Sequence, residues 1–193
     1  MRLDRRRLAE QILEASLAHD AVQSDRLLRF RNVEPETAEL LALLIRSTRA
    51  RSILEIGTSN GYSTIWLADA AEATGGTLVS VEIDPERTAL ARANLARAGL
   101  AAELRTEDAA QTLQAARDGC WDFVFLDAER PAYAGYWPHL LRTLRPDGGL
   151  LAIDNVVSHA VEVEQVSRLI DAEPSVESVL VPIGAGLRLV IHD

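Results

Sequence analysis

The stretch SILEIGTSNGYSTIWLA, residues 52–68, decides the fold of this chain. It begins with a short, mostly apolar run typical of a buried strand, and Gly57 and Gly61 then precede a helical pattern. Glycines let a backbone turn sharply and approach a bound group closely, so this strand, turn and helix suit a nucleotide-like cofactor. The spacing is Gly-x-x-x-Gly rather than Gly-x-Gly-x-x-Gly, which disfavours an NAD-dependent oxidoreductase.

Strands and helices alternate on both sides of this unit. Two further strands near the end, 176–181 and 187–191, are joined by a Pro- and Gly-rich connection too short for a crossover helix, so they should form an antiparallel hairpin. The alternation predicts an α/β fold with a mostly parallel sheet and helices on both faces. The other expected strands are 52–56, 77–81, 101–106, 123–126 and 150–153, and the expected helices that follow them are 63–73, 85–98, 109–117, 132–144 and 161–172.

Length and charge limit the function. The 193 residues suit one domain, 1–193, in which residues 1–30 form an N-terminal helical extension. A net charge of −9 argues against a broad phosphate-binding surface, so a small molecule is the expected partner, and the arginines at 5–7 and 26–31 are interpreted as solvated helix faces. No window is long and apolar enough to span a membrane, and a cytoplasmic location is expected.

Polar residues follow several of the expected strands. Glu82 ends the second strand, where its carboxylate could accept hydrogen bonds from ribose hydroxyls, while Asp84 before Pro85 suits a helix cap. Asp108 and Ala109 would lie beside an adenine ring, although Asp108 could equally be only a helix cap. These positions predict a cofactor pocket at the carboxyl edge of the sheet.

Asp127 ends the fourth expected strand, and Asp154 and Asn155 end the fifth. Because the carboxyl ends of parallel strands meet at one edge, these three side chains should converge. Two carboxylates and an amide oxygen are hard ligands of the kind that Mg²⁺ prefers. The sequence therefore predicts a divalent-cation site.

Four segments together resemble the cation-dependent O-methyltransferases, including catechol and caffeoyl-CoA O-methyltransferases: LEIGTSNGYS (54–63), VEIDPE (81–86), LDAERPAY (126–133) and GGLLAIDNV (148–156). The resemblance spans roughly residues 30–193 and implies a Rossmann-like class I methyltransferase fold with a seven-stranded sheet. It further implies S-adenosylmethionine as methyl donor, Mg²⁺ or a similar cation, a small hydroxylated acceptor and a homodimer. The predicted donor-binding residues are Val33, Glu55, Gly57, Thr58, Gly61, Ser63, Glu82, Asp108, Ala109 and Asp127; the predicted metal ligands are Asp127, Asp154 and Asn155; and the predicted catalytic residues are Asp127 and Arg130. For Glu55, a buried structural acid is the alternative.

Two departures from the resembling family affect the acceptor side. Arg130 stands where those enzymes usually carry a lysine, and the chain contains no lysine at all. Arginine stays protonated, so it can stabilise a phenolate or orient an acceptor but cannot act as an ordinary general base. The segment after Asn155 is also shorter than usual and should enter a helix almost immediately, with His159 as an exposed residue at its start. A tRNA hydroxy-nucleoside methyltransferase and a noncatalytic S-adenosylmethionine-binding module therefore remain alternatives.

Overall fold

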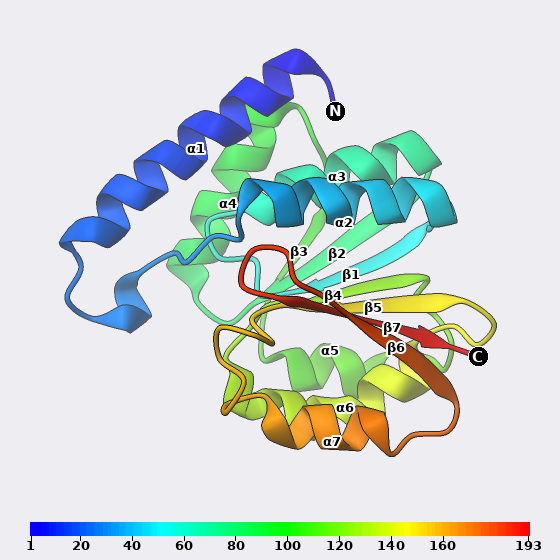
Figure 1. Ribbon diagram of the computed structural model, residues 1–193. Helices are drawn as coiled ribbons and strands as arrows, with labels where there is room; N and C mark the ends of the chain where they lie inside the picture. Colours follow the sequence, from blue (N-terminus) through cyan, green and yellow to red (C-terminus); the bar gives the residue numbers. More distant parts are fainter.

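The computed structural model describes all residues, 1–193, and shows a central sheet between two layers of helices (Figure 1). The sheet has seven strands in the order β3-β2-β1-β4-β5-β7-β6. Neighbouring strands from β3 to β5 run parallel, whereas β7 is antiparallel to both β5 and β6. The predicted fold class and C-terminal hairpin are therefore confirmed. The strands are β1 Ser52–Ile56, β2 Thr77–Glu82, β3 Glu103–Thr106, β4 Phe123–Leu126, β5 Gly149–Ile153, β6 Val176–Val181 and β7 Leu187–His192.

The helices divide between the two faces of the sheet. In Figure 1, α1 to α4 cover one face, with α1 outermost, and α5 to α7 cover the other. Short 3₁₀ helices precede α2 and α6. The helices are α1 Leu3–Val22, η1 Arg26–Leu28, α2 Pro35–Thr48, α3 Tyr62–Thr74, α4 Pro85–Ala98, α5 Ala109–Ala115, η2 Arg130–Ala132, α6 Tyr133–Thr143 and α7 Glu164–Asp171.

The side chains of the central strands alternate between two hydrophobic cores. Along β1, Ile53 joins the core under α1 to α4, whereas Leu54 and Ile56 join the core under α5 to α7. This alternation follows from the two-residue period of a strand, and burial on both faces explains why β1 and β4 are apolar runs. The position facing α3 between Ile53 and the turn is Glu55, a carboxylate inside an otherwise apolar strand.

The segment after β5 differs from the prediction. Residues 156–163 form turns, and α7 begins only at Glu164 rather than at 161. The reason is that the Val157 and Ser158 amides both donate to the carbonyl of Ala185 in the β6–β7 loop, at 3.1 and 2.9 Å. Asn155 itself has φ +67°, a left-handed conformation that ends the strand direction and that asparagine tolerates better than most residues. This turn segment therefore faces the carboxyl edge of the sheet, next to the hairpin loop.

Of the arginines expected on solvated helix faces, Arg6, Arg7 and Arg26 are exposed, whereas Arg5 is buried. Arg5 is only 5% exposed, and its guanidinium contacts Asp69 and Glu72 of α3 and the carbonyl of Ala98 in α4. This buried ion pair holds α1 against α3 and α4. None of the helices is both long and apolar enough to cross a membrane.

Candidate active site

A cavity of about 580 Å³ lies at the carboxyl ends of β1, β2, β4 and β5. Its wall includes residues from the segment between α1 and α2, the turns after the strands and the loop after β5. Seven predicted donor residues line it, namely Val33, Gly57, Ser63, Glu82, Asp108, Ala109 and Asp127. Glu55, Thr58 and Gly61 do not line it.

The two glycines of the turn after β1 serve different contacts. Gly57 has φ +107°, and a Cβ there would lie 2.0 Å from the carbonyl oxygen of Asp127. Gly61 has φ +86°, and a Cβ there would lie 2.9 Å from the Cα of Ala91 in α4. Gly57 therefore brings the donor turn against the end of β4, whereas Gly61 lets α3 begin close against α4.

Glu82 is fixed by backbone amides at the floor of the donor end. Its Oε2 accepts from the Ser59 amide at 2.8 Å, and its Oε1 accepts from the amides of Ile83 and Asp84 at 3.0 and 3.1 Å. The side chain is 9% exposed and lines the cavity. A carboxylate has about four lone-pair sites, so Glu82 keeps acceptor capacity for a ligand hydroxyl. As expected, Asp84 caps α4, accepting from the Glu86 and Arg87 amides.

Glu55 lies in a buried polar cluster beneath the cavity wall. It is fully buried, and its carboxylate accepts hydrogen bonds of 2.6 Å from Ser63, Thr64 and Ser80. Burial raises the pKa of Glu55 to about 7 against the opposing effect of these three hydroxyls. Thr58 joins the same cluster through the Ser80 hydroxyl. Of this cluster only Ser63 reaches the cavity, so Glu55 acts on it through Ser63.

Asp108 is a helix cap that also lies in the cavity wall, and its contact with an adenine ring stays a prediction. It caps α5 by accepting from the Ala110 amide at 2.8 Å, and it also lines the cavity together with Ala109. The Tyr136 hydroxyl, 3.3 Å from Asp108 Oδ1, comes from α6 and lines the same region. The sequence does not indicate this role for Tyr136, because aromatic residues at helical spacing more often pack than bind.

The three predicted metal ligands converge at the other end of the cavity, where Asp127 and Asn155 line the wall and Asp154 is buried next to Asn155. The Asn155 side-chain amide donates to Asp127 Oδ1 at 2.9 Å and to Asp154 Oδ2 at 3.2 Å, so a partially positive NH₂ group stands between two carboxylates. Asp154 is 2% exposed, and its Oδ1 has no hydrogen-bond partner. Burial raises the pKa of Asp154 to about 6, and burial together with the nearby Asp154 charge raises the pKa of Asp127 well above its usual range. Two crowded carboxylates with an unpartnered buried oxygen suit a divalent cation, provided that Asn155 turns its amide oxygen inward.

Arg130 lies at the same end of the cavity as Asp127. Its side chain is 3% exposed, its Nε donates to Glu162 Oε2 at 2.8 Å, and its buried Nη2 has no partner. Arg130 also lines the cavity. Its charge acts on Asp127, and its catalytic role stays a prediction.

The segment between α1 and α2 forms a wall that the sequence reasoning mostly missed. The Phe30 and Arg31 amides donate to Asp20 at the end of α1, and the Ser59 hydroxyl donates to the Phe30 carbonyl at 3.0 Å. Arg31, Asn32 and Val33 then line the cavity, although only Val33 was predicted to do so. The pairing of Asp20 with amides ten residues later is not visible as a local pattern.

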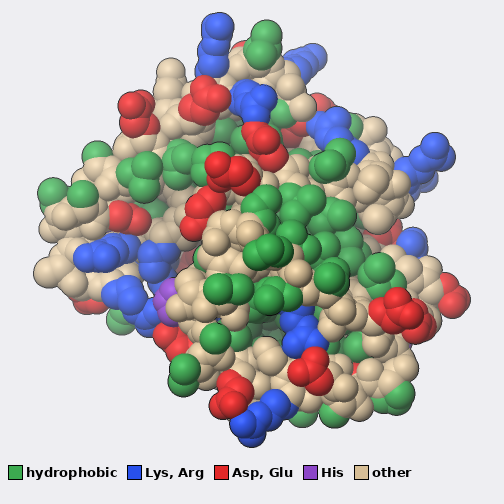
Figure 2. All heavy atoms as spheres, in the orientation of Figure 1, with side chains coloured by type: hydrophobic (Ala, Val, Ile, Leu, Met, Phe, Trp, Pro, Cys, Tyr) green, Lys and Arg blue, Asp and Glu red, His purple; other side chains and the backbone are tan.

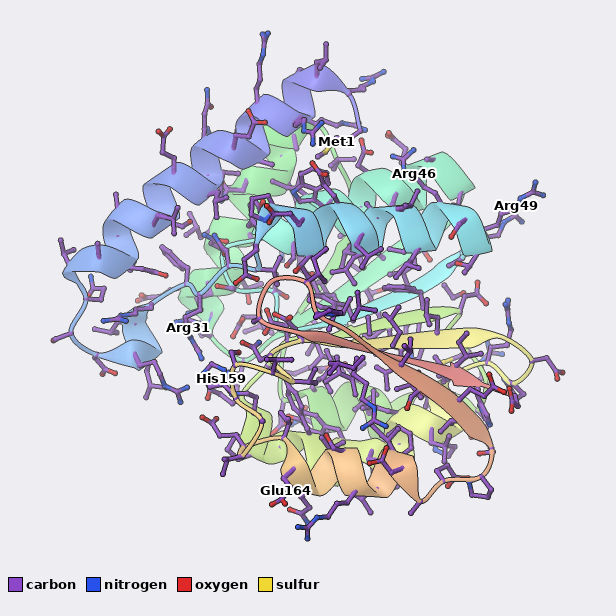
Figure 3. The ribbon with its side chains drawn as sticks, in the orientation of Figure 1. Met1, Arg31, Arg46, Arg49, His159 and Glu164 are labelled. Carbon is purple, nitrogen blue, oxygen red and sulfur yellow. The ribbon has the colours of Figure 1, made fainter.

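His159 also differs from the expectation. It lies in the turn segment rather than at a helix start, is partly buried and lines the cavity. Figure 3 shows Arg31 and His159 on the same side of the molecule, one from the segment before α2 and the other from the loop after β5. Burial, and next the Arg130 charge, lower the pKa of His159, so it is mainly neutral near pH 7.

Comparisons with known proteins agree with this geometry. Residues 9–192 match the family model described as O-methyltransferase. Catechol O-methyltransferase from Niastella koreensis is 38% identical over 151 residues, covering 76% of this chain and 66% of that protein; the protein of the same name from Mycobacterium tuberculosis is 37% identical over 145 residues, covering 74% and 63%. The matched parts thus span just under two thirds of these relatives. An O-methyltransferase from Bacillus cereus, whose structure was determined in complex with SAH (S-adenosylhomocysteine), superposes with a TM-score of 0.80 at 30% identity, covering 96% of this chain and 90% of that one.

The strand order, the antiparallel hairpin and the cavity at the carboxyl edge define a class I methyltransferase fold. Within that class, the family match over residues 9–192 shows that the chain belongs to the O-methyltransferase family.

Proposed function

We propose that this protein transfers the methyl group of S-adenosylmethionine to a hydroxyl oxygen of a small acceptor, with a divalent cation bound beside the acceptor. The observation that carries the proposal is a single cavity that joins Gly57 and Glu82 at one end to Asp127 and Asn155 at the other. The names of the Niastella and Mycobacterium relatives and the SAH-bound Bacillus structure support the same reaction.

In this proposal the donor lies against the turn after β1. The Glu82 carboxylate, already oriented by three amides, accepts hydrogen bonds from the ribose hydroxyls. Asp108 and Ala109 border the adenine, and Ser63, backed by Glu55, faces the methionine part. Acidic side chains at this end also suit the positive sulfonium and ammonium groups of the donor.

Asp127, Asp154 and Asn155 would hold the cation. When bound, the cation supplies Lewis acidity that lowers the pKa of the acceptor hydroxyl and fixes its position. The protein contributes two carboxylates whose burial and mutual repulsion make their ionised forms costly without a positive partner. Asn155, in its left-handed conformation, supplies the third group.

The methyl transfer does not require a lysine as general base. The acceptor hydroxyl gives its proton to solvent, and a lone pair of the resulting oxygen forms a bond to the methyl carbon. The bond between that carbon and sulfur breaks, and its electron pair stays on sulfur, leaving a neutral thioether. Arg130 keeps its positive charge and orients the acceptor rather than taking its proton.

The test is a methylation assay with S-adenosylmethionine and catechol, with products identified by mass spectrometry. We expect a product heavier by one methyl group, formed with Mg²⁺ and lost after chelation or in Asp154→Asn. Saturable SAH binding without any product from a panel of hydroxylated acceptors would instead support a noncatalytic module. Absence of SAH binding would reject the donor assignment itself.

We further propose a homodimer formed through the edge of the sheet near α2. Figure 2 shows hydrophobic side chains gathered on this face of the molecule. Val179 of β6 and Ile191 of β7 are 57% and 44% exposed, and Leu43 of α2 is 62% exposed. Large apolar side chains grouped on a surface commonly mark an interface, so this edge is the surface we assign to the second copy.

A further inference from the structure

We propose that the natural acceptor carries a carboxylate in addition to its hydroxyl, and that Arg31 and Arg130 bind this carboxylate. The inference rests on the proposed function and specifies the substrate class of the same cavity. It comes from the polar groups of the acceptor end that have no partner.

Three donors around the acceptor end are buried and unpaired. They are Arg130 Nη2, Arg31 Nε and Asn32 Nδ2. All three residues line the cavity, and Arg130 is only 3% exposed. A buried donor without an acceptor costs free energy, and such groups in a cavity wall indicate that a ligand supplies the acceptor. The free acceptor at this end, Asp154 Oδ1, belongs to the cation side, so the three donors point to an oxygen-rich anion.

The positive charges of this part of the wall also favour an anionic ligand. Arg31 and Arg26 share one carboxylate, Glu129, at 2.6 and 3.5 Å, while Arg130 pairs with Glu162. Three guanidinium groups therefore face two carboxylates. Glu34, another acid at this end, adds its charge to Asp154 and so belongs to the cation side.

The opposite end of the cavity is acidic. Glu82, Asp84, Glu107 and Asp108 all line it there, and Arg87 lies 3.8 Å from Asp84. A cationic donor and an anionic acceptor would thus each meet the end of opposite charge. Such complementarity orients two ligands within one cavity, and it penalises an acceptor that enters with a positive group.

A neutral acceptor would leave the guanidinium donors unpaired. A carboxylate would satisfy them with charge-assisted hydrogen bonds, for which Arg has a suitable planar geometry. Bonds of this kind change affinity by roughly tenfold to a hundredfold. We therefore expect a carboxylic acid to bind at least about tenfold tighter than its methyl ester.

The decisive experiment compares 3,4-dihydroxybenzoate with methyl 3,4-dihydroxybenzoate, which differ at the carboxyl group alone. Each is titrated calorimetrically into the protein saturated with SAH and Mg²⁺, and each is then offered as methyl acceptor. We expect the acid to bind more tightly and to have the higher kcat/KM, mainly through KM. Equal affinity for the two compounds, or no affinity for either, overturns the inference.

Variants locate the effect. In Arg31→Gln the preference for the acid over the ester should fall about tenfold, and Arg130→Gln provides a second, independent test. Arg92→Gln is the matched control, because Arg92 is exposed on α4 and makes no ion pair in the structure. A preference that survives in both cavity variants contradicts the assignment. If the ester is methylated as efficiently as the acid, only this inference fails. If the acid, the ester and catechol all remain unmethylated, the proposed function fails.

Discussion

Replacing Glu82 by glutamine should weaken SAH binding roughly a hundredfold. The carboxylate is oriented by the amides of Ser59, Ile83 and Asp84, so its remaining lone pairs are presented to the cavity in a fixed direction. Hydrogen bonds to a charged group contribute about 1.5–3 kcal/mol each, and the three amides leave about one lone-pair site of Glu82 for a ribose hydroxyl. A loss near the upper end of this range, about 3 kcal/mol, corresponds to roughly a hundredfold change in Kd.

Calorimetric titration with SAH measures this loss directly. Glu86→Gln is the matched control, because Glu86 is exposed in the first turn of α4 and its side chain makes no hydrogen bond in the structure. In Glu82→Gln the new side-chain NH₂ group would face at least one backbone N–H, so the variant should also lose about 1–3 kcal/mol of stability, and both proteins are compared well below their Tm. A Kd within twofold of the parent protein, in a folded Glu82→Gln variant, would refute the assignment of Glu82 to the ribose.

Three further outcomes are expected. The Glu55 pKa is raised from its unfolded value to about 7, so the folded state binds the proton more tightly and stability falls as pH rises towards 7. Urea denaturation should therefore show that the free energy of unfolding falls between pH 5 and 8 in the parent protein, and that this fall is smaller by roughly 2 kcal/mol in Glu55→Gln. Mg²⁺ at about 100 times its Kd should raise Tm by several degrees at pH 8, less at pH 5 where the Asp154 pKa of about 6 lets protons compete, and hardly at all in Asp154→Asn. Val179→Glu should convert a dimer to a monomer in analytical ultracentrifugation. Leu180→Glu should not, because Leu180 is similarly exposed but is directed to the other face of β6. If neither variant changes the sedimentation coefficient, the proposed interface is rejected.

Much of the fold follows from local patterns. The apolar runs of β1 and β4 and the helical periodicity after them require burial on both faces of a strand, which a parallel sheet provides. The position of α1 does not follow from such a pattern, because α1 is held partly by the ion pairs of Arg5 with Asp69 and Glu72. A buried arginine has the same sequence signature as a solvated one, and only its partners in three dimensions distinguish them.

The cavity residues at the ends of strands were more predictable than those in irregular segments, for a physical reason. Glu82, Asp127 and Asp154 each end a strand, and the carboxyl edge of a parallel sheet brings such residues together whatever the loops do. Arg31 and His159 belong to segments without regular structure, whose paths depend on contacts with Asp20 and with the β6–β7 loop. Those contacts join residues that carry no shared pattern in the sequence.

Arg130 affects both the proposed proton removal and the proposed choice of acceptor. An arginine here cannot take the acceptor proton, so the acceptor has to be acidified by the cation that Asp127 and Asp154 would hold. The same permanent charge lets Arg130 bind an anionic group at all ordinary pH values, which a lysine used as a base could not do while neutral. Under the two proposals, a fixed cation in place of a base would make the reaction more dependent on the metal and would favour an acidic acceptor.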